Sequence, residues 1–391
     1  MALSTSIAFF QARSDRNIIG HCGDHRNFFY YSTERAAAPK KKKKKVMCDS
    51  RSVQLVALMT VATAVVVMVM VKRCGRVLAA IDLGSGEHKL VIARVSGHRV
   101  RVLVSESVGV ALGVDLRRPG SDGLLSEAIL DKSRLVLERF CKLCAERKVQ
   151  ARVGVATAVF RRAKNGPDHI RAMNEIILLK VIGQRDEGRL GFLTAVAAAA
   201  RRRMKVDFAF DSGGGSFQIT SRDQVYEGPI GNADAYAILR DMSEFDVDLF
   251  VEKLRAELPP APDWLKDRPD AVIVGFGHTT SIFRLAADLA GTPDLTIDNV
   301  KSALDFVYAK RNDKASLAAE LRELAKLHAS KIAPFDTFID QPYPEASLIT
   351  PKLGLLLAVM MHLDLRTIHY EQANGNCLGL FLDTELWNTK Q

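Results

Sequence analysis

The stretches Ala79-Ala-Ile-Asp-Leu-Gly-Ser-Gly86 and Phe208-Ala-Phe-Asp-Ser-Gly-Gly-Gly215 decide the fold of this 391-residue chain. In each, an apolar run ends on an Asp, and a Gly-rich turn leads into a second apolar run, which is typical of a β-hairpin. The distance from Asp82 to Asp211 is 129 positions. This recurrence predicts a duplicated α/β domain, with a cleft where the two copies meet.

Strand and helix patterns follow one another around these turns. Apolar runs rich in β-branched residues predict strands at 77–82, 90–95, 99–108, 152–156, 206–211, 216–221, 271–275 and 366–370. Helical periodicity predicts helices at 126–148, 169–179, 186–203, 281–289, 297–310, 314–327 and 351–363. No Gly/Ser-rich or Pro-rich linker separates the halves, so we expect two closely packed domains, 76–204 and 205–391.

Composition and charge narrow the functional classes. Hydrophobic residues make up 48% of the chain and charged residues 26%, which is typical of a globular α/β protein. The formal net charge is +10, but residues 1–71 hold 11 Lys and Arg against 4 Asp and Glu, which leaves only +3 for the other 320 residues. A nearly neutral body argues against nucleic acid as a partner of the folded domains.

The six cysteines are too scattered to indicate a disulfide framework. Cys141 and Cys144 form a Cys-x-x-Cys pair inside the helix predicted at 126–148. A zinc site needs a second pair of ligands, so we interpret these two cysteines as ordinary helix residues.

The amino-terminal segment, residues 1–52, is basic and contains a run of lysines at 40–45. It precedes an apolar segment, 53–71, whose 19 uncharged positions are long enough to span a bilayer. Three interpretations stay open: a single-pass membrane anchor with the amino terminus in the cytosol, an organelle-targeting peptide, and a true start at Met47 or Met70. A start at Met70 would leave a cytoplasmic protein.

The Gly-rich turns have the chemistry of phosphate sites. Glycines carry no Cβ atom, so their backbone N–H groups can approach an anion closely. An Asp at the end of the preceding strand is placed to hold a divalent cation through water. We therefore predict Asp82 and Asp211 as metal ligands, with an ordinary turn-capping Asp as the alternative for each. The predicted phosphate contacts in the turns are Gly84, Ser85, Gly213, Gly214, Gly215 and Ser216.

Taken together, these residues resemble the exopolyphosphatase and guanosine pentaphosphate phosphohydrolase (Ppx/GppA) family of the actin-like ATPase superfamily. The resemblance extends over about 77–385 and is carried by the segments 80–85, 156–165, 181–190, 210–216 and 275–279. It implies two RNase H-like domains around a cleft and a phosphoanhydride hydrolase. It also implies polyphosphate or a phosphorylated guanine nucleotide as substrate and Mg²⁺ or another divalent cation as cofactor.

The resemblance also assigns roles to single residues. It implies Glu187 as the catalytic base, and Arg161, Gly277 and Thr279 as phosphate contacts. The alternatives from the residues themselves are a solvated helix carboxylate for Glu187 and a surface side chain for Arg161. The oligomeric state stays open between a monomer and a homodimer.

Three departures from the family pattern bear on activity. Gln218 stands where the family has a Glu, so we expect it to offer the metal an oxygen without a charge. Glu87 places a carboxylate beside the first turn, where it could repel a highly charged substrate. The segment 375–379 lacks the family's Arg/Glu pair. Two alternatives follow: a catalytically weak phosphate or nucleotide sensor, and an apyrase-like nucleoside-triphosphate hydrolase.

Overall fold

The computed structural model describes residues 75–97, 99–244, 246–266, 268, 270–332 and 346–388. The predicted basic segment, 1–52, and the apolar segment, 53–71, lie outside these ranges. Within the part of the chain that the structure describes, no helix combines the length and the apolar character needed to cross a membrane.

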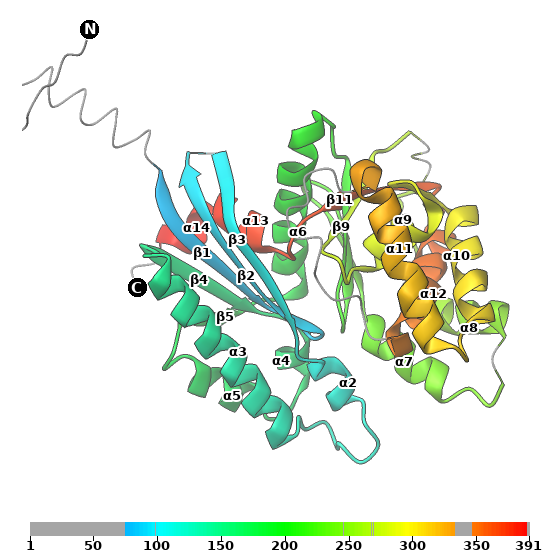
Figure 1. Ribbon diagram of the computed structural model, residues 1–391, viewed down its shortest axis with the longest axis horizontal. Coiled ribbons are helices and arrows are strands. Elements are labelled where there is room, and N and C mark those ends of the chain that lie inside the picture. The colour runs from blue at the N-terminus through cyan, green and yellow to red at the C-terminus, as the bar shows by residue number, and fades with distance from the viewer. Residues whose placement is uncertain are drawn as a thin grey trace, which may run out of the picture. The chain divides into compact units, whose positions relative to one another are not determined.

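A five-stranded sheet with the strand order β3-β2-β1-β4-β5 forms the core of the first lobe (Figure 1). β1, β2 and β3 are antiparallel neighbours, and β4 and β5 continue the sheet in parallel with β1. The strands are β1 (Arg76–Leu83), β2 (Glu87–Ser96), β3 (Arg99–Gly109), β4 (Ala151–Ala156) and β5 (Leu179–Val181). The helices of this lobe are α2 (Leu112–Leu116), α3 (Glu127–Glu146), α4 (Ala158–Arg162) and α5 (Gly166–Met173).

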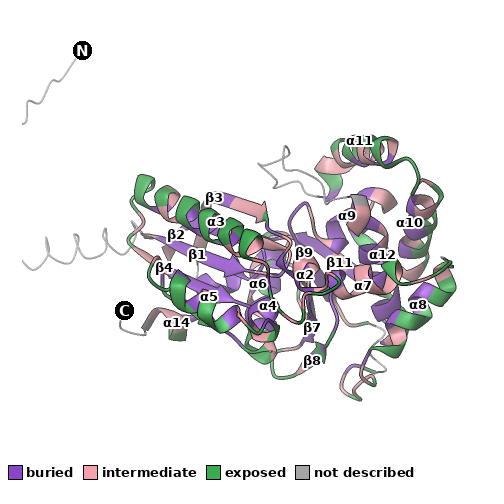
Figure 2. Ribbon diagram, turned by 90° about the horizontal axis from the view of Figure 1, so that it is seen from below, coloured by how far each residue is buried: buried purple, intermediate pink, exposed green. Residues whose placement is uncertain are grey.

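Side-chain alternation along β1 explains how this sheet is covered on both faces. Ile81 and Leu83 join a core with Phe140 of α3 and Ile170 of α5. The intervening Ala80 faces a second core that contains residues near the carboxyl terminus. In Figure 2, α3 and α5 present exposed outer surfaces and cover the buried strands beneath them.

The second lobe repeats this plan with a six-stranded sheet of order β10-β11-β9-β6-β7-β8. β6, β7 and β8 are antiparallel, β9 and β11 run parallel to β6, and β10 closes the edge. The strands are β6 (Phe208–Ser212), β7 (Phe217–Thr220), β8 (Val225–Gly228), β9 (Ile273–Gly277), β10 (Asp294–Thr296) and β11 (Thr367–Gln372). The predicted duplication of an α/β hairpin domain is therefore confirmed.

Six helices of the second lobe pack into one large core on this sheet, around Phe210, Phe250 and Leu356. They are α7 (Asn232–Arg240), α8 (Val247–Ala256), α9 (Ile282–Ala290), α10 (Ile297–Ala309), α11 (Lys314–Ile332) and α12 (Ile349–His362). Ser281 begins α9 as its N-cap and accepts a hydrogen bond from Arg284 N, as the predicted helix at 281–289 requires.

Two helices connect the lobes. α6 (Gln184–Ala199) packs on β6 and β7 of the second sheet, whereas α13 (Cys377–Leu382) packs on β1 and β2 of the first sheet. In Figure 1, α13 lies beside the first sheet although it follows β11 of the second; α14 (Thr384–Asn388) follows it. The domain limits 76–204 and 205–391 stay predictions. The helix α6 precedes residue 205 but packs on the second sheet, and α13 follows residue 205 but packs on the first sheet.

The predicted helix at 169–179 is wrong over its second half. α5 ends at Met173, and Leu179 begins strand β5. Asn174 causes the change in direction, because its Oδ1 accepts a hydrogen bond from Leu179 N at 2.7 Å. The strand then pairs Leu179 with Gly154, where the absence of a Cβ atom leaves room for the leucine side chain.

Candidate active site

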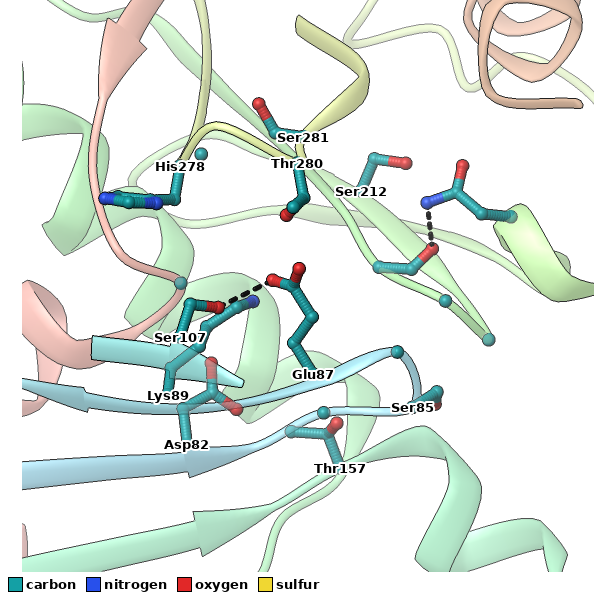
Figure 3. A pocket seen from close by; sticks show the side chains of 18 of the residues that line it. Asp82, Ser85, Glu87, Lys89, Ser107, Thr157, Ser212, His278, Thr280 and Ser281 are labelled. Atoms are coloured by element: carbon teal, nitrogen blue, oxygen red, sulfur yellow. Dashed lines mark hydrogen bonds between the residues drawn. The ribbon is translucent and has the colours of Figure 1, made fainter. Parts of the chain in front are cut away.

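A cavity of about 310 Å³ is lined by residues of both lobes. The predicted site residues that line this cavity are Asp82, Gly84, Ser85, Glu187, Asp211, Gly213, Gly214, Gly215, Ser216, Gly277 and Thr279. Arg161 and Gln218 do not line it. Figure 3 shows how the labelled side chains of the two lobes converge on this space. The predicted phosphate turns therefore meet at one site, while their roles stay predictions.

The two Gly-rich turns have the same hairpin closure. Gly84 N donates to Glu87 O at 3.0 Å, and Gly213 N donates to Ser216 O at 2.9 Å. The turns also approach each other closely, because a Cβ atom on Gly214 would lie 3.0 Å from Gly86 N. Backbone N–H groups of two facing turns form a concave surface suited to the oxygens of a phosphate group.

Glu187 lies in the first turn of α6 with its carboxylate buried at the cavity wall. Arg161 Nη1 donates to Glu187 Oε2 at 3.0 Å and to the carbonyl oxygen of Ile182 at 2.7 Å. Burial raises the pKa of Glu187 to about 8, although Arg161 lowers it, and Asp211 and Asp82 raise it further. A carboxylate with a pKa near the working pH is suited to accept a proton.

Asp82 and Asp211 occupy equivalent positions at the ends of β1 and β6, and Asn376 joins them. Asn376 N donates to Asp82 Oδ2 at 3.1 Å, and its side chain forms a hydrogen bond with Asp211. Burial raises the pKa of Asp211 to about 6 against the opposing effect of Lys89. Burial alone would lower the pKa of Lys89, but Asp82, Glu87 and Asp211 outweigh it, so the net shift is upward.

The carboxylates of Asp82 and Asp211 fit a divalent cation that keeps most of its water ligands. Mg²⁺ keeps several of its waters in proteins and binds through one or two carboxylates together with substrate phosphates. Asp82 and Asp211 both line the cavity and supply such a pair. Gln218 does not line the cavity, and its Nε2 donates to Ser216 Oγ at 3.3 Å. Among the described residues, no group of three or more His, Cys, Asp or Glu side chains could hold a metal.

Sequence reasoning missed several polar residues of the cavity. Lys352 is buried on α12 in a run that is otherwise almost entirely apolar, and its Nζ donates to the carbonyl oxygen of Thr280. Burial lowers the pKa of Lys352 to about 8, and Glu87 opposes this shift. In the sequence, the signal for Lys352 as a site residue was its position as a single lysine inside an apolar helix. The other polar residues that line the cavity and were missed are Lys89, Ser107, Lys132, Thr157, Ser212, Asn232, Thr280, Ser281 and Asn376.

Ion pairs on the other side of the turns hold the two lobes together. Asp234 of α7 accepts a hydrogen bond from Arg117 Nε at 2.8 Å and another from Arg162 Nη1 at 3.2 Å. Both arginines belong to the first lobe, and Asp234 has only 12% of its side chain exposed. Arg162 also donates to the carbonyl oxygen of Pro229. We call these three charged residues the interlobe clasp.

Residues 90–227 match the model of the Ppx/GppA phosphatase family. The matched span contains Arg161, Glu187, Asp211 and the second Gly-rich turn, whereas the first turn precedes it. Over this span, which is about a third of the chain, the protein is similar to the Ppx/GppA phosphatase family. This similarity is consistent with phosphoanhydride hydrolysis, the activity supported at the level of the family.

Solved structures of similar proteins agree with the fold. The Ppx/GppA family member of Aquifex aeolicus is 19% identical with a TM-score of 0.55, and the match covers 81% of this chain and 99% of that one. An exopolyphosphatase from Cytophaga hutchinsonii is 18% identical with a TM-score of 0.57, covering 80% and 98%. An exopolyphosphatase-like protein reaches a TM-score of 0.60 at 19% identity, covering 79% and 97%. These likenesses confirm the two-lobed, actin-like ATPase fold.

Proposed function

We propose that this protein is a metal-dependent phosphoanhydride hydrolase that releases the terminal phosphate of short inorganic polyphosphate or of guanosine pentaphosphate. The observation that carries the proposal is the position of Glu187. Its buried carboxyl group, with a pKa raised to about 8, lines the same cavity as both Gly-rich turns. Such a group near phosphate-binding turns is what in-line attack by water requires.

In this proposal Glu187 acts as general base. Its ionised carboxylate accepts a proton from a water molecule while the water oxygen bonds to the terminal phosphorus. The bond from phosphorus to the bridging oxygen breaks, and the leaving phosphate keeps the electron pair. Arg161 is a positioning residue, because it binds the carboxylate and does not line the cavity.

The turns and the cavity cations would hold the substrate. Backbone N–H groups of the two turns would bind the phosphoryl oxygens, and Lys89 and Lys352 would offset their charge. When bound beside Asp82 and Asp211, a divalent cation supplies further charge neutralisation.

The direct test is phosphate release by the purified chain with Mg²⁺ from tripolyphosphate, long-chain polyphosphate, guanosine pentaphosphate and ATP. Glu187→Gln should lower turnover about 10²- to 10⁴-fold, since it keeps the shape of the side chain but cannot accept the proton. Asp186→Asn is the matched control, because Asp186 is the exposed neighbour on the same helix. Equal turnover in the parent and Glu187→Gln would overturn the proposed mechanism.

A sensor that binds phosphate without turnover is the second candidate. The segment 375–379 favours it, because this segment lines the cavity through Gly375 and Asn376 and supplies no charged side chain where the family has an Arg/Glu pair. Tight tripolyphosphate binding with no phosphate release would establish the sensor. Preferred release from ATP would instead support the apyrase-like alternative.

Membrane or organelle attachment through 53–71 also stays a proposal, as does a homodimer. Fractionation of cells expressing the full chain, beside a chain that starts at Met70, would test attachment. Light scattering of the purified protein would give the oligomeric state.

A further inference from the structure

Glu87 begins β2 directly after the first Gly-rich turn and extends into the cavity (Figure 3). Ser107 Oγ of the first lobe donates to its Oε2 at 2.8 Å. The Thr280 side chain of the second lobe lines the same cavity and helps to lower the pKa of this carboxylate. The carboxylate therefore interacts with groups of both lobes.

Two lysines complete the surroundings of this carboxylate. Lys89 from the first lobe and Lys352 from the second interact with it electrostatically. Burial alone would raise the pKa of Glu87, but these lysines and the two hydroxyl groups outweigh it and lower the pKa below its ordinary value. Glu87 is accordingly an ionised carboxylate at neutral pH.

The two lysines, Ser107, Thr280 and Glu87 all line the same cavity. Ammonium and hydroxyl groups are the donors that bind an oxyanion. A phosphate oxygen and a carboxylate oxygen accept from the same donors. Here the chain itself supplies the anion, on a side chain that is anchored beside the first turn.

We propose that Glu87 is a tethered competitor of the substrate, whose carboxylate fills an oxyanion subsite formed by Lys89, Lys352, Ser107 and Thr280. This inference rests on the proposed function and specifies its substrate class. A phosphate group can use the subsite only by displacing the carboxylate, which stays close because the backbone holds it. Each further negative charge on the ligand adds repulsion, so Glu87 disfavours highly charged polyphosphates more than ligands of low charge.

The test compares ligand affinity in the parent and in Glu87→Gln by isothermal titration calorimetry of the full chain. The probes are tripolyphosphate and orthophosphate, each with Mg²⁺ and with a chelator. Glutamine keeps the length and the hydrogen bonding of the side chain but removes its charge. We expect Glu87→Gln to bind tripolyphosphate at least about tenfold more tightly, because close like charges in a partly buried site repel by more than that factor. The gain for orthophosphate should be smaller.

Two further variants separate charge from structure. Glu138→Gln, at an exposed position on α3 that pairs with Arg134, makes the same change in net charge outside the cavity and should leave both affinities unchanged. Glu87→Ala removes the charge and the hydrogen bonds, and it should also tighten tripolyphosphate binding. It serves as the second measurement if Glu87→Gln fails to fold.

Equal or weaker tripolyphosphate binding in both Glu87 variants would overturn this inference, as would equal gains for the two probes. Failure of the proposed function is a separate result, since it is read from turnover in the Glu187 pair. Tighter binding in Glu87→Gln without turnover in any protein would support the tethered competitor and reject the hydrolase.

Discussion

The two Gly-rich turns share a backbone but differ in the residues that follow them. Both close with the same glycine hydrogen bond, and both follow an Asp that lines the cavity. After the first turn, the charged residues Glu87 and Lys89 line the cavity, whereas at the equivalent positions after the second turn Ser216 lines it without a charge and Gln218 does not line it. The duplicated backbone thus supplies two phosphate cradles, and the residues after the turns give them different chemistry.

The two lobes therefore contribute different chemical groups to the cavity. The first lobe brings fixed charges to the cavity wall, including the carboxylate that we propose as a competitor. The second lobe brings the proposed base, Glu187, on a helix that packs against its own sheet, and Lys352 from α12. We therefore expect substitutions of first-lobe residues and of second-lobe residues to change stability and turnover differently.

The largest effect on stability is expected from Lys89→Gln. Loss of the ammonium leaves Asp82, Glu87 and Asp211 without the cation whose pKa they raise. Removing one partner from such a charge cluster costs about 3 kcal/mol of unfolding free energy. Urea denaturation measures this loss. Lys180→Gln, at an exposed position on β5, is the control and should cost almost nothing, so equal losses would contradict the cluster.

The corresponding change after the second turn is Gln218→Glu. Gln218 is only 1% exposed and lies off the cavity wall, so a carboxylate there is buried without a cation. We expect a loss of about 2 kcal/mol at pH 7 and no gain in turnover. Burial raises the pKa of the new carboxyl above its unfolded value, so the loss should disappear as the pH falls below about 4.

Gln224→Glu is the matched control, because Gln224 is exposed in the turn before β8. Its stability should equal that of the parent at both pH values. A gain in turnover in Gln218→Glu would show that this position reaches the bound metal although Gln218 does not line the cavity.

The sequence predicted the backbone of the site more fully than its charges. The turns at Gly84 and Gly213 were predictable because local glycine and β-strand patterns determine a hairpin. The hydrogen bond from Arg161 to Glu187 was not predictable, because it joins α4 to α6 through the packing of two helices on different sheets. Lys352 follows the first turn by more than 260 positions, and only the closure of the lobes brings it to Glu87.

The pH dependence of turnover should follow the ionisation of Glu187, the proposed base. Below its pKa of about 8, Glu187 is mostly protonated and cannot accept a proton from water. The value of kcat/KM should therefore rise about tenfold per pH unit toward pH 8 and then level off. Arg161 lowers the pKa of Glu187, so Arg161→Gln should move the midpoint to higher pH. An unchanged midpoint would mean that another group limits the reaction.

The smallest effect on unfolding free energy is expected at the interlobe clasp. These residues join the two lobes and do not contribute to the cavity chemistry. Asp234→Asn removes the charge that Arg117 and Arg162 share but keeps an oxygen acceptor for both. Because these arginines are about one-third exposed, water compensates part of the loss, and we expect about 1 kcal/mol in unfolding free energy. The parent should lose this advantage as salt is raised, whereas the variant should not. Asp263→Asn is the control, because Asp263 pairs with Lys266 and its own side chain is 99% exposed. If the difference in unfolding free energy from the parent is equally small for Asp234→Asn and Asp263→Asn and depends on salt in the same way, the clasp contributes no more than an ordinary surface pair.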